Sequence, residues 1–209
     1  DIDLNIVKFK FNIKNYPKLK NSHVSEATYY RIFIGDHIES NSNFIIYLDA
    51  DAYVVNNPFK EIKESINYMD ENNMLLGAKT TDYFSKQQSV DIFKRLNIND
   101  KYFNAGVLVI NLKKWKDEKI SKKLQEQVKK IENEIVYWDQ DVLNSFINGN
   151  YYEISEGLNH IVNLNTKENF ENREVKIIHY VGSLKPWDKK GIKADPNNYY
   201  QSLNKKYFS

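Results

Sequence analysis

The sequence contains no cysteine, and this absence removes several kinds of site at once. Disulfide frameworks, thiolate zinc sites and cysteine nucleophiles are all excluded. A bound metal ion would therefore need oxygen or imidazole ligands. The absence of cysteine also fits a reducing compartment, so we expect a cytoplasmic protein.

The sequence also lacks a charge surplus and a long apolar run. Its 30 Lys and Arg residues against 28 Asp and Glu residues give a formal charge of +2, so we expect no nucleic-acid partner. No apolar segment approaches the roughly 20 residues of a membrane span, and the first four residues do not resemble a signal peptide. We expect one domain over residues 1–209.

Segments with strand and helix patterns alternate along the chain, as in an α/β fold. Apolar runs or alternation predict strands at 5–12, 44–48, 74–78, 106–110 and 175–181. Helical spacing predicts helices at 22–34 and 59–69, one long helix after Trp115, and one from about Asp139 to Gly149. We expect 83–100 to be irregular. Because the run at 44–48 is continuous, we expect it to be covered on both faces in a mostly parallel mixed sheet.

Asp49 and Asp51 directly follow the apolar strand predicted at 44–48. Two carboxylates two positions apart at a strand end project to the same side, so both can reach one cation. Asp-x-Asp also occurs at 1/3 and 139/141, so the pattern alone is weak. The 49/51 pair differs because it lies at the carboxyl end of a buried strand, where α/β proteins bind ligands. We predict a metal site there, with turn-capping carboxylates as the alternative.

Four further polar residues have open interpretations from the residues alone. His179 lies near the end of the last predicted strand and is either a structural histidine or a metal ligand. Arg31 lies on an apolar helix face, which requires a buried carboxylate or a ligand phosphate beside it. Asp139 and Gln140 occupy positions typical of an N-cap and a first helical turn.

Five segments, in this order, carry a more specific pattern: 28–31 (TYYR), 46–51 (IYLDAD), 102–107 (YFNAGV), 138–144 (WDQDVLN) and 179–187 (HYVGSLKPW). Together they resemble the retaining glycosyltransferases of family 8, the group that includes bacterial lipo-oligosaccharide galactosyltransferases and glycogenin. The resemblance implies a Rossmann-like nucleotide-sugar transferase fold of the GT-A type. It also implies earlier βα units that hold uracil and ribose. Those units are not recognisable in this sequence, so we expect it to be part of a longer enzyme.

The resemblance also implies roles for individual residues. Asp49, Asp51 and His179 would ligate Mn²⁺, with Mg²⁺ as the alternative, because mixed oxygen and imidazole ligands favour a transition ion. The implied donor-binding residues are Arg31, Ala50, Asn104, Gly182, Lys185 and Asp82, with Gly182 and Lys185 at the diphosphate. Asp139 would hydrogen-bond the donor sugar, and Gln140 would face the anomeric carbon opposite the leaving group. These two are the expected catalytic residues.

The implied reaction moves galactose or glucose from a UDP-sugar to a glycan, in bacterial lipopolysaccharide or lipo-oligosaccharide synthesis. The acceptor would be an oligosaccharide or a lipid-linked glycan. Residues 195–209 mix bases and aromatics, which suits peripheral contact with the inner face of a membrane; a solvated tail is the alternative.

Two other functions fit parts of the pattern. A haloacid-dehalogenase-like phosphatase also places Asp-x-Asp after an apolar strand, but it expects Thr or Val where Tyr53 stands. A catalytically inactive sugar- or nucleotide-binding relative would keep the site residues without performing the reaction.

Overall fold

The computed structural model describes residues 4–17, 25–82, 84–99, 101–164, 174–194, 200–202 and 205. The strands are β1 (Phe44–Leu48), β2 (Ala52–Val54), β3 (Leu76–Thr80), β4 (Phe103–Asn111), β5 (Tyr152–Glu153), β6 (His160–Asn163) and β7 (Ile177–Val181). The helices are η1 (Glu26–Phe33), α1 (Ile34–His37), α2 (Phe59–Glu71), α3 (Lys86–Leu96), α4 (Leu112–Asp117), α5 (Ile120–Lys130), α6 (Trp138–Ile147), η2 (Glu156–Leu158) and α7 (Lys189–Ala194). This is a mixed α/β fold, as predicted.

The larger sheet is built around β4, which is buried along its whole length. Its strand order is β1-β4-β3-β5. Alternate residues of β4 enter two different cores, Leu108 and Ile110 on one face and Val107 and Val109 on the other. A strand that fills two cores has no polar face, which explains the continuous apolar sequence of this segment.

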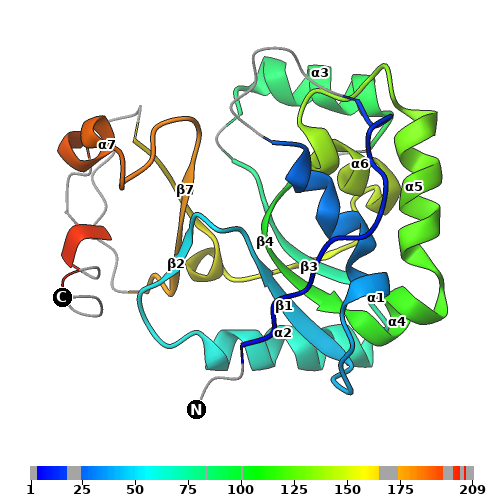
Figure 1. Cartoon of the computed structure of the whole chain (residues 1–209), viewed down its shortest axis with the longest axis horizontal. Coiled ribbons are helices and arrows are strands. Elements are labelled where there is room, and N and C mark those ends of the chain that lie inside the picture. The colour runs from blue at the N-terminus through cyan, green and yellow to red at the C-terminus, as the bar shows by residue number, and fades with distance from the viewer. Residues whose placement is uncertain are drawn as a thin grey trace.

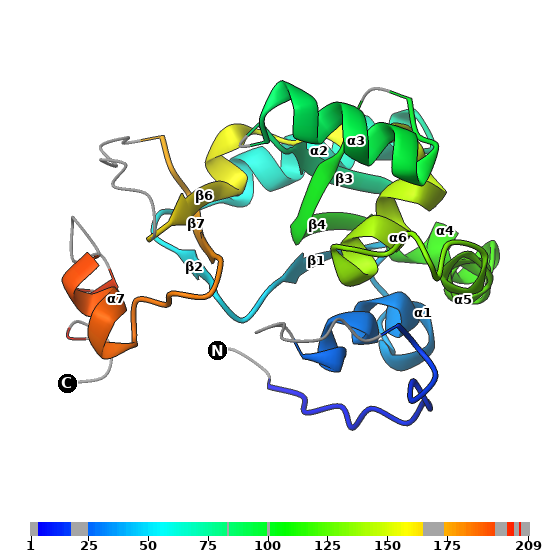
Figure 2. The ribbon, with the colours of Figure 1, turned by 90° about the horizontal axis from the view of Figure 1, so that it is seen from above.

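Helices cover both faces of this sheet. On one face, α2 packs Met69 against Val107 and Val109. On the other face lie η1, α1, α4, α5 and α6, whose apolar side chains share one core with Leu108 and Ile110. Figure 2 shows the sheet edge-on between α2 and the η1–α1 segment. The carboxyl end of β1 points away from the helices that cover the larger sheet and toward the smaller, second sheet (Figure 1).

The smaller sheet has the order β2-β7-β6 and lies beside the larger one (Figure 1). It has its own apolar cluster, which includes Ile178 and Tyr180. In the pairing of β2 with β7, Ala52 lies opposite His179, and the backbone N–H of Tyr180 donates to the carbonyl of Asp51 at 3.0 Å. This register brings His179 next to the Asp49–Asp51 turn.

One expectation about the strands is confirmed and one is wrong. β1 pairs antiparallel with β4 at the edge of the described sheet. Its side chains pack alternately on the two cores, Ile45 and Tyr47 on one and Phe44 and Ile46 on the other, so both faces of the strand are covered. Among the described pairs, β3–β5 and β6–β7 are parallel and the other three are antiparallel, so the sheets are mixed but not mostly parallel. An apolar run shows that a strand contacts a core, but it does not encode the direction of its neighbours.

Residues 5–12 do not form the predicted strand. Phe9 stacks on Tyr30 with ring centroids 3.6 Å apart, and Phe11 stacks on Phe33 at 4.5 Å. The alternating aromatic side chains therefore pack along η1 instead of lining one face of a sheet. Val7, on the same predicted face, is 51% exposed.

The region 83–100, expected to be irregular, contains helix α3. Ser85 caps it: its hydroxyl accepts from the backbone N–H of Gln88, whose side chain accepts from the backbone N–H of Ser85. The helix predicted after Trp115 is confirmed as α5, which buries Ile120, Leu124 and Val128. A shorter helix, α4, precedes it, and Lys119 between the two helices has a φ of 53°. The helix predicted at 22–34 is present from Glu26 as the 3₁₀ helix η1, and the first three residues of the predicted range lie outside the described residues.

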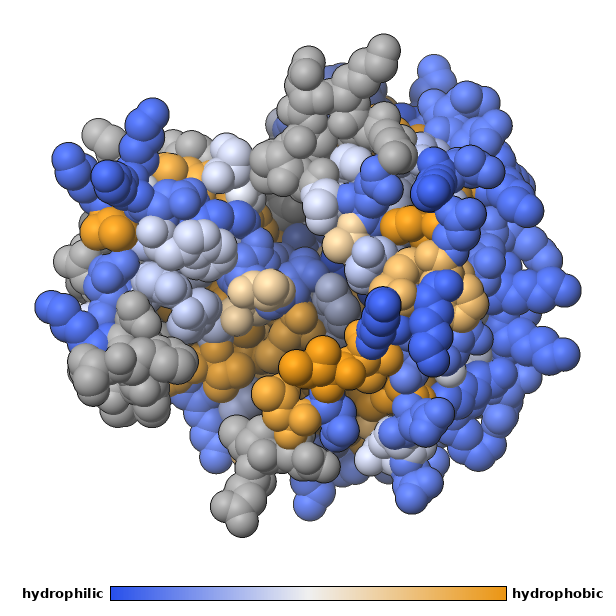
Figure 3. Space-filling view, viewed as in Figure 1, coloured by the Kyte–Doolittle hydropathy of each residue, from blue (hydrophilic) through white to orange (hydrophobic). Residues whose placement is uncertain are grey.

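Figure 3 shows a hollow between the two sheets, with hydrophobic side chains gathered across the lower middle of this face. The exposed apolar residues of the structure include Leu4, Ile6 and Leu48. In the part of the chain that the structure describes, no helix is both long and apolar enough to cross a bilayer. Most of the tail 195–209 lies outside that part.

Candidate active site

Asp49 and Asp51 lie where the chain turns from β1 into β2, and their side chains are 26% and 23% exposed. The turn is closed by the backbone N–H of Ala52, which donates to the carbonyl of Asp49 at 3.0 Å. His179 Nε2 lies 3.3 Å from Asp51 Oδ1 and 3.8 Å from Asp49 Oδ2. One ligand atom from each residue lies within 4.8 Å of the others. The three residues predicted to share a metal ion thus come together at one point.

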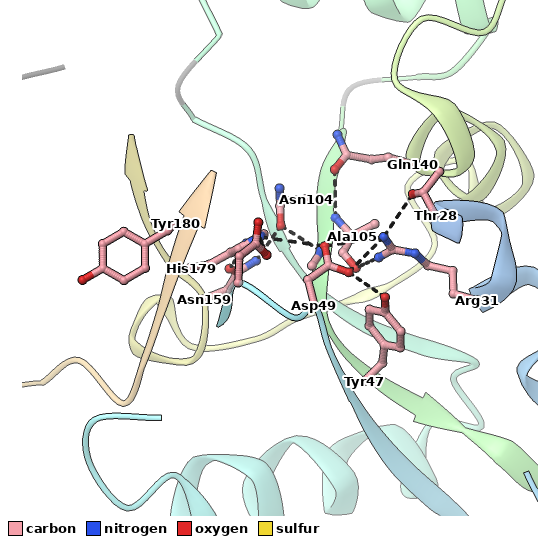
Figure 4. Close-up of polar contacts among 12 residues, drawn as sticks. Thr28, Arg31, Tyr47, Asp49, Asn104, Ala105, Gln140, Asn159, His179 and Tyr180 are labelled. Carbon is pink, nitrogen blue, oxygen red and sulfur yellow. Dashed lines mark hydrogen bonds and ion pairs between the residues drawn. The ribbon is translucent and has the colours of Figure 1, made fainter. Parts of the chain in front are cut away.

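The imidazole of His179 is held by its surroundings. Its Nδ1 lies 3.1 Å from Asn159 Oδ1, and the ring rests against Gly106 of β4. A Cβ atom on Gly106 would come within 2.0 Å of His179 Cε1, so only glycine leaves room for the ring. Figure 4 shows His179 and Asn159 on the side of Asp49 that faces away from Arg31.

These three side chains have the chemistry of a divalent-cation site. Asn159 faces Nδ1 with an oxygen, and a neutral imidazole that donates its one proton to this oxygen presents an unprotonated Nε2 to the two carboxylates. The lone pair of Nε2 then faces the carboxylate oxygens of Asp49 and Asp51, and a cation between them would remove the repulsion. Two carboxylate oxygens and one imidazole nitrogen suit Mn²⁺ better than Mg²⁺, which prefers oxygen alone. The residues therefore fit a divalent metal.

Lys185 provides the positive charge that faces Asp51. Its Nζ lies 2.5 Å from Asp51 Oδ2 and 2.6 Å from the carbonyl of Tyr180. Burial alone would raise the pKa of Asp51, but the contacts with His179 in its protonated form and with Lys185 outweigh it and hold that pKa well below its usual value. Asp51 is therefore ionised at neutral pH and ready to bind a cation.

Arg31 connects the candidate metal group, which consists of Asp49, Asp51 and His179, to Asp139 of α6. It is buried, and its guanidinium lies 3.1 Å from Asp49 Oδ1, pairs with Asp139 and donates to the carbonyl of Ala105. Its Cζ also sits 4.6 Å from the centroid of the Tyr47 ring, whose hydroxyl donates to Asp49. The open question about this buried arginine is thus answered: its partners are carboxylates (Figure 4).

Asp139 lies inside α6 and does not cap it, so the N-cap expectation is wrong. The helix begins at Trp138, one residue earlier, and the N-cap position is Tyr137. Asp139 is fully buried, pairs with Arg31 and accepts a hydrogen bond from the Thr28 hydroxyl. Burial raises its pKa to about 6 even though Arg31 and Thr28 act in the opposite direction.

Gln140 is held at both ends of its carboxamide. Its Oε1 accepts from the backbone N–H of Ala105 at 3.0 Å, and its Nε2 donates to the Tyr102 hydroxyl at 3.1 Å. That hydroxyl in turn donates to Asp141 Oδ1 at 2.7 Å. The chain of donors fixes which end of the Gln140 amide is oxygen.

Asp141 supports the turn that starts α6. Its Oδ2 accepts from the backbone N–H groups of Val136 and Tyr137 at 2.7 and 2.8 Å and pairs with Arg95 at 2.8 Å. Trp138, inside this turn, has a φ of 51°, a strained conformation for a bulky residue. The strain is maintained directly before the two residues that face the site, Asp139 and Gln140.

The remaining predicted residues lie at different distances from this centre. Asn104, on β4, is buried, and its oxygen accepts from Asn159 Nδ2 at 3.1 Å, so it belongs to the group. Gly182 follows β7 with a φ of 84°. Ala50 is exposed in the turn between the two aspartates. Asp82 is exposed after β3, and no described contact joins it to the other site residues.

Three residues of the site were not predicted: Tyr47, Tyr102 and Asn159. Tyr47 and Tyr102 stand inside two of the five motif segments, so a signal for them was present. Asn159 stands in none of them, and nothing in its local sequence distinguishes it from the chain's other asparagines.

Residues 2–191 match the family described as glycosyl transferase family 8. The chain is 30% identical over 182 residues to the lipopolysaccharide 1,3-galactosyltransferase of Salmonella typhimurium, covering 84% of this chain and 52% of the relative. It is 26% identical over 210 residues to the lipopolysaccharide 1,2-glucosyltransferase of Escherichia coli K12, covering 96% and 61%. The chain thus spans about half to three fifths of the length of these relatives.

The fold is similar to the crystal structure of the galactosyltransferase LgtC in complex with donor and acceptor sugar analogs. The TM-score is 0.75 at 26% sequence identity, over 94% of this chain and 72% of the other. This agreement in fold covers nearly all of the chain.

Proposed function

Because the chain belongs to glycosyltransferase family 8 and has the GT-A fold, we propose that it carries the catalytic centre of a retaining hexosyltransferase that uses a UDP-sugar. The observation that carries the proposal is the convergence of Asp49, Asp51 and His179 beside Gln140 and Arg31. The similar galactosyl- and glucosyltransferases named above favour UDP-galactose or UDP-glucose as donor.

Asp49, Asp51 and His179 would hold the divalent cation, with Mn²⁺ preferred over Mg²⁺. Such an ion, when bound, supplies positive charge to the departing diphosphate. Lys185 carries its ammonium at the same place, 2.5 Å from Asp51, and can turn to the diphosphate. Gly182, without a side chain at the end of β7, leaves room for a phosphate beside its backbone.

The sugar would lie between Asn104 and α6, bound by Arg31, Asn104 and Asp139. Asp139 is already engaged by Arg31 and Thr28 in a fully buried position, which does not suit a nucleophile. Gln140 presents a neutral amide, which is a poor nucleophile. We therefore favour attack by the acceptor hydroxyl on the face that the diphosphate leaves. The anomeric C–O bond to the diphosphate breaks, the new C–O bond forms, and the hydroxyl proton passes to the diphosphate.

The acceptor, an oligosaccharide or a lipid-linked glycan of lipopolysaccharide synthesis, is part of the same proposal. Cytoplasmic localisation, peripheral membrane contact through 195–209 and the roles of Ala50 and Asp82 stay predictions. An inactive relative that only binds sugar or nucleotide would have the same static site, so an assay must separate it from an enzyme.

The test is release of UDP from a panel of UDP-sugars by the full-length protein, with Mn²⁺, with Mg²⁺ and with a chelator. Wild type is compared with Asp51→Asn and with Asp70→Asn, an exposed aspartate of α2 that serves as the matched control. We expect metal-dependent release that Asp51→Asn loses and Asp70→Asn keeps. Absence of release from every sugar would contradict the proposal and favour an inactive binding protein.

A further inference from the structure

The two nitrogens of His179 have different neighbours. Nε2 faces the carboxylates of Asp49 and Asp51, whereas Nδ1 faces Oδ1 of Asn159 at 3.1 Å. His179 and Asn159 are 3% and 2% exposed, so water does not compete for this contact. The proton on the imidazole is therefore placed by the protein.

Backbone geometry fixes the orientation of the Asn159 amide. The N–H of Gly106 donates to Asn104 Oδ1 at 2.9 Å, and because a backbone N–H can only donate, the atom that it meets must be oxygen. Asn159 Nδ2 donates to the same oxygen at 3.1 Å. Its other terminal atom, the oxygen, is thereby turned toward His179.

We infer that Asn159 is a positioning residue of the metal centre: it keeps the His179 proton on Nδ1 and leaves the Nε2 lone pair to the cation. A carboxamide oxygen can only accept, so this contact is a hydrogen bond when Nδ1 carries the proton. The direction of each bond follows from the Gly106 N–H, which belongs to the buried strand β4. We call the series Gly106 N–H, Asn104, Asn159 and His179 the amide relay. The inference rests on the proposed function because it assigns His179 to the metal.

The physical need for the relay comes from the carboxylates. Without an acceptor at Nδ1, a neutral imidazole gains more by placing its proton on Nε2, where Asp51 Oδ1 lies at 3.3 Å. A cation would then have to displace that proton from its own ligand atom. Asn159 removes this competition before the metal arrives, and Gly106 allows the ring to lie in the required place.

The relay also limits what Asn104 can offer a ligand. Its oxygen already accepts from Gly106 and Asn159, so only its Nδ2 group is left to face the sugar. Asn104 would therefore act toward the donor as a hydrogen-bond donor, to a hydroxyl or ring oxygen.

The first test reads the tautomer directly in metal-free, full-length protein with ¹⁵N-labelled histidine. Long-range ¹H–¹⁵N spectra, recorded at a pH where the imidazole is neutral, distinguish a protonated Nδ1 from a protonated Nε2. We expect wild type to carry the proton on Nδ1 and Asn159→Leu to carry it on Nε2. A proton on Nε2 in neutral wild-type His179 would overturn the inference, and this measurement needs no variant to fold.

The second test measures Mn²⁺ affinity in the absence of any sugar nucleotide. We expect Asn159→Leu to bind Mn²⁺ about 10–100-fold more weakly, the usual effect of losing the hydrogen-bond partner behind a metal-bound histidine. Asn159→Asp keeps an acceptor at Nδ1 but loses the donor to Asn104 Oδ1, so it should bind Mn²⁺ more tightly than Asn159→Leu. Equal affinity in wild type and Asn159→Leu would overturn the inference.

A matched control separates positioning from general destabilisation. Asn111 is also buried, but its side chain caps α4, away from the metal group. Asn111→Leu should lower the melting temperature and leave Mn²⁺ affinity and the His179 tautomer unchanged. If wild type binds no Mn²⁺, the metal part of the proposed function fails, whereas the tautomer measurement still decides whether the amide relay exists.

Discussion

Two Asp-x-Asp pairs stand in the described part of the chain, and the structure gives them opposite tasks. Asp49 and Asp51 lie in the turn after strand β1, are partly exposed and face one histidine. Asp139 and Asp141 lie in the first turn of α6, are buried, and each pairs with a different arginine, Arg31 and Arg95. The same three-letter pattern thus forms a candidate metal site in one place and two separate ion pairs in the other.

The difference comes from the backbone that carries each pair. Asp49 and Asp51, two positions apart, lie in the turn that follows β1, and this turn holds both carboxylates beside His179, so they can converge on one cation. In a helix the same spacing turns the second side chain by about 200°, so the two carboxylates point apart. Asp139 therefore faces the site and Asp141 faces Arg95. Burial without a shared cation requires a separate positive partner for each.

The largest expected effect is on stability, from Asp141→Leu. This change leaves Arg95, the Tyr102 hydroxyl and the backbone N–H groups of Val136 and Tyr137 without their acceptor. We expect the free energy of unfolding to fall by about 3–5 kcal/mol, as when one partner of a buried pair is removed. Urea denaturation measures it, with Asp70→Asn as control. A loss below about 1 kcal/mol would mean that Asp141 is not structural.

Asp51→Asn should have a large effect on Mn²⁺ affinity and a small effect on the stability of the metal-free protein. Loss of a partner behind a metal ligand costs about 10–100-fold in affinity, and loss of the ligand itself should cost at least the upper figure. Because Asp51 is partly exposed, its pairs contribute only about 1 kcal/mol or less to metal-free stability. Mn²⁺ titration and urea denaturation of the same samples check both parts. Unchanged Mn²⁺ affinity would remove Asp51 from the ligand set.

The two pairs should also differ in their response to pH. The pKa of Asp139 is raised from 3.8 to about 6 in the folded protein, so its contribution to stability is complete below about pH 3.8 and is lost as pH rises through 6. The pKa of Asp51 is lowered, so its contribution is present above the ordinary aspartate pKa and is lost only in stronger acid.

Asp139→Asn isolates the first of these effects. Between pH 4 and pH 7, metal-free wild type should lose up to about 3 kcal/mol of unfolding free energy relative to the variant, since each pKa unit corresponds to about 1.4 kcal/mol. Denaturation curves at several pH values give the difference. A difference that does not change with pH would show that folding does not raise the pKa of Asp139.

The smallest effect is expected from Lys185→Gln. The ammonium of Lys185 lies 2.5 Å from Asp51 Oδ2 and competes there with a cation. Its removal should raise the affinity for Mn²⁺ alone by a few-fold, about 1 kcal/mol, and weaken the binding of UDP. Calorimetry with each ligand measures the two changes. Weaker Mn²⁺ binding in the variant would contradict this role of Lys185.

The sequence predicted which three residues come together in the candidate metal group, because the evidence for each is local. Asp49 and Asp51 follow one apolar run, and His179 stands near the end of another. The pairing of β2 with β7, which sets Ala52 opposite His179, then brings the three side chains together. The family resemblance raised the histidine from an ordinary structural residue to a ligand. Arg31 was recognisable in the sequence as a charge on an apolar helix face. Its carboxylate partners were not, because Asp49 and Asp139 lie 18 and 108 positions away.

Other features could not be read from the sequence, or were missed there. Asn159 acts through contacts with strands β4 and β7, and no local pattern marks such a residue. The direction of β1 depends on its neighbours, which an apolar run does not specify. The helix α3 was missed although its signal was present, since Ser85 and Gln88 form a capping box three residues apart.

The candidate metal group lies across the boundary between the two sheets. Asp49 extends from β1 of the larger sheet, whereas His179 belongs to β7 of the smaller one, whose apolar core is much the smaller of the two. A cation held by both can bind only while the sheets are docked, so metal occupancy and docking become one linked equilibrium. Loss of the ion would then favour opening of the smaller sheet first. Amide hydrogen exchange in the metal-free protein would accordingly be faster in β7 than in β4.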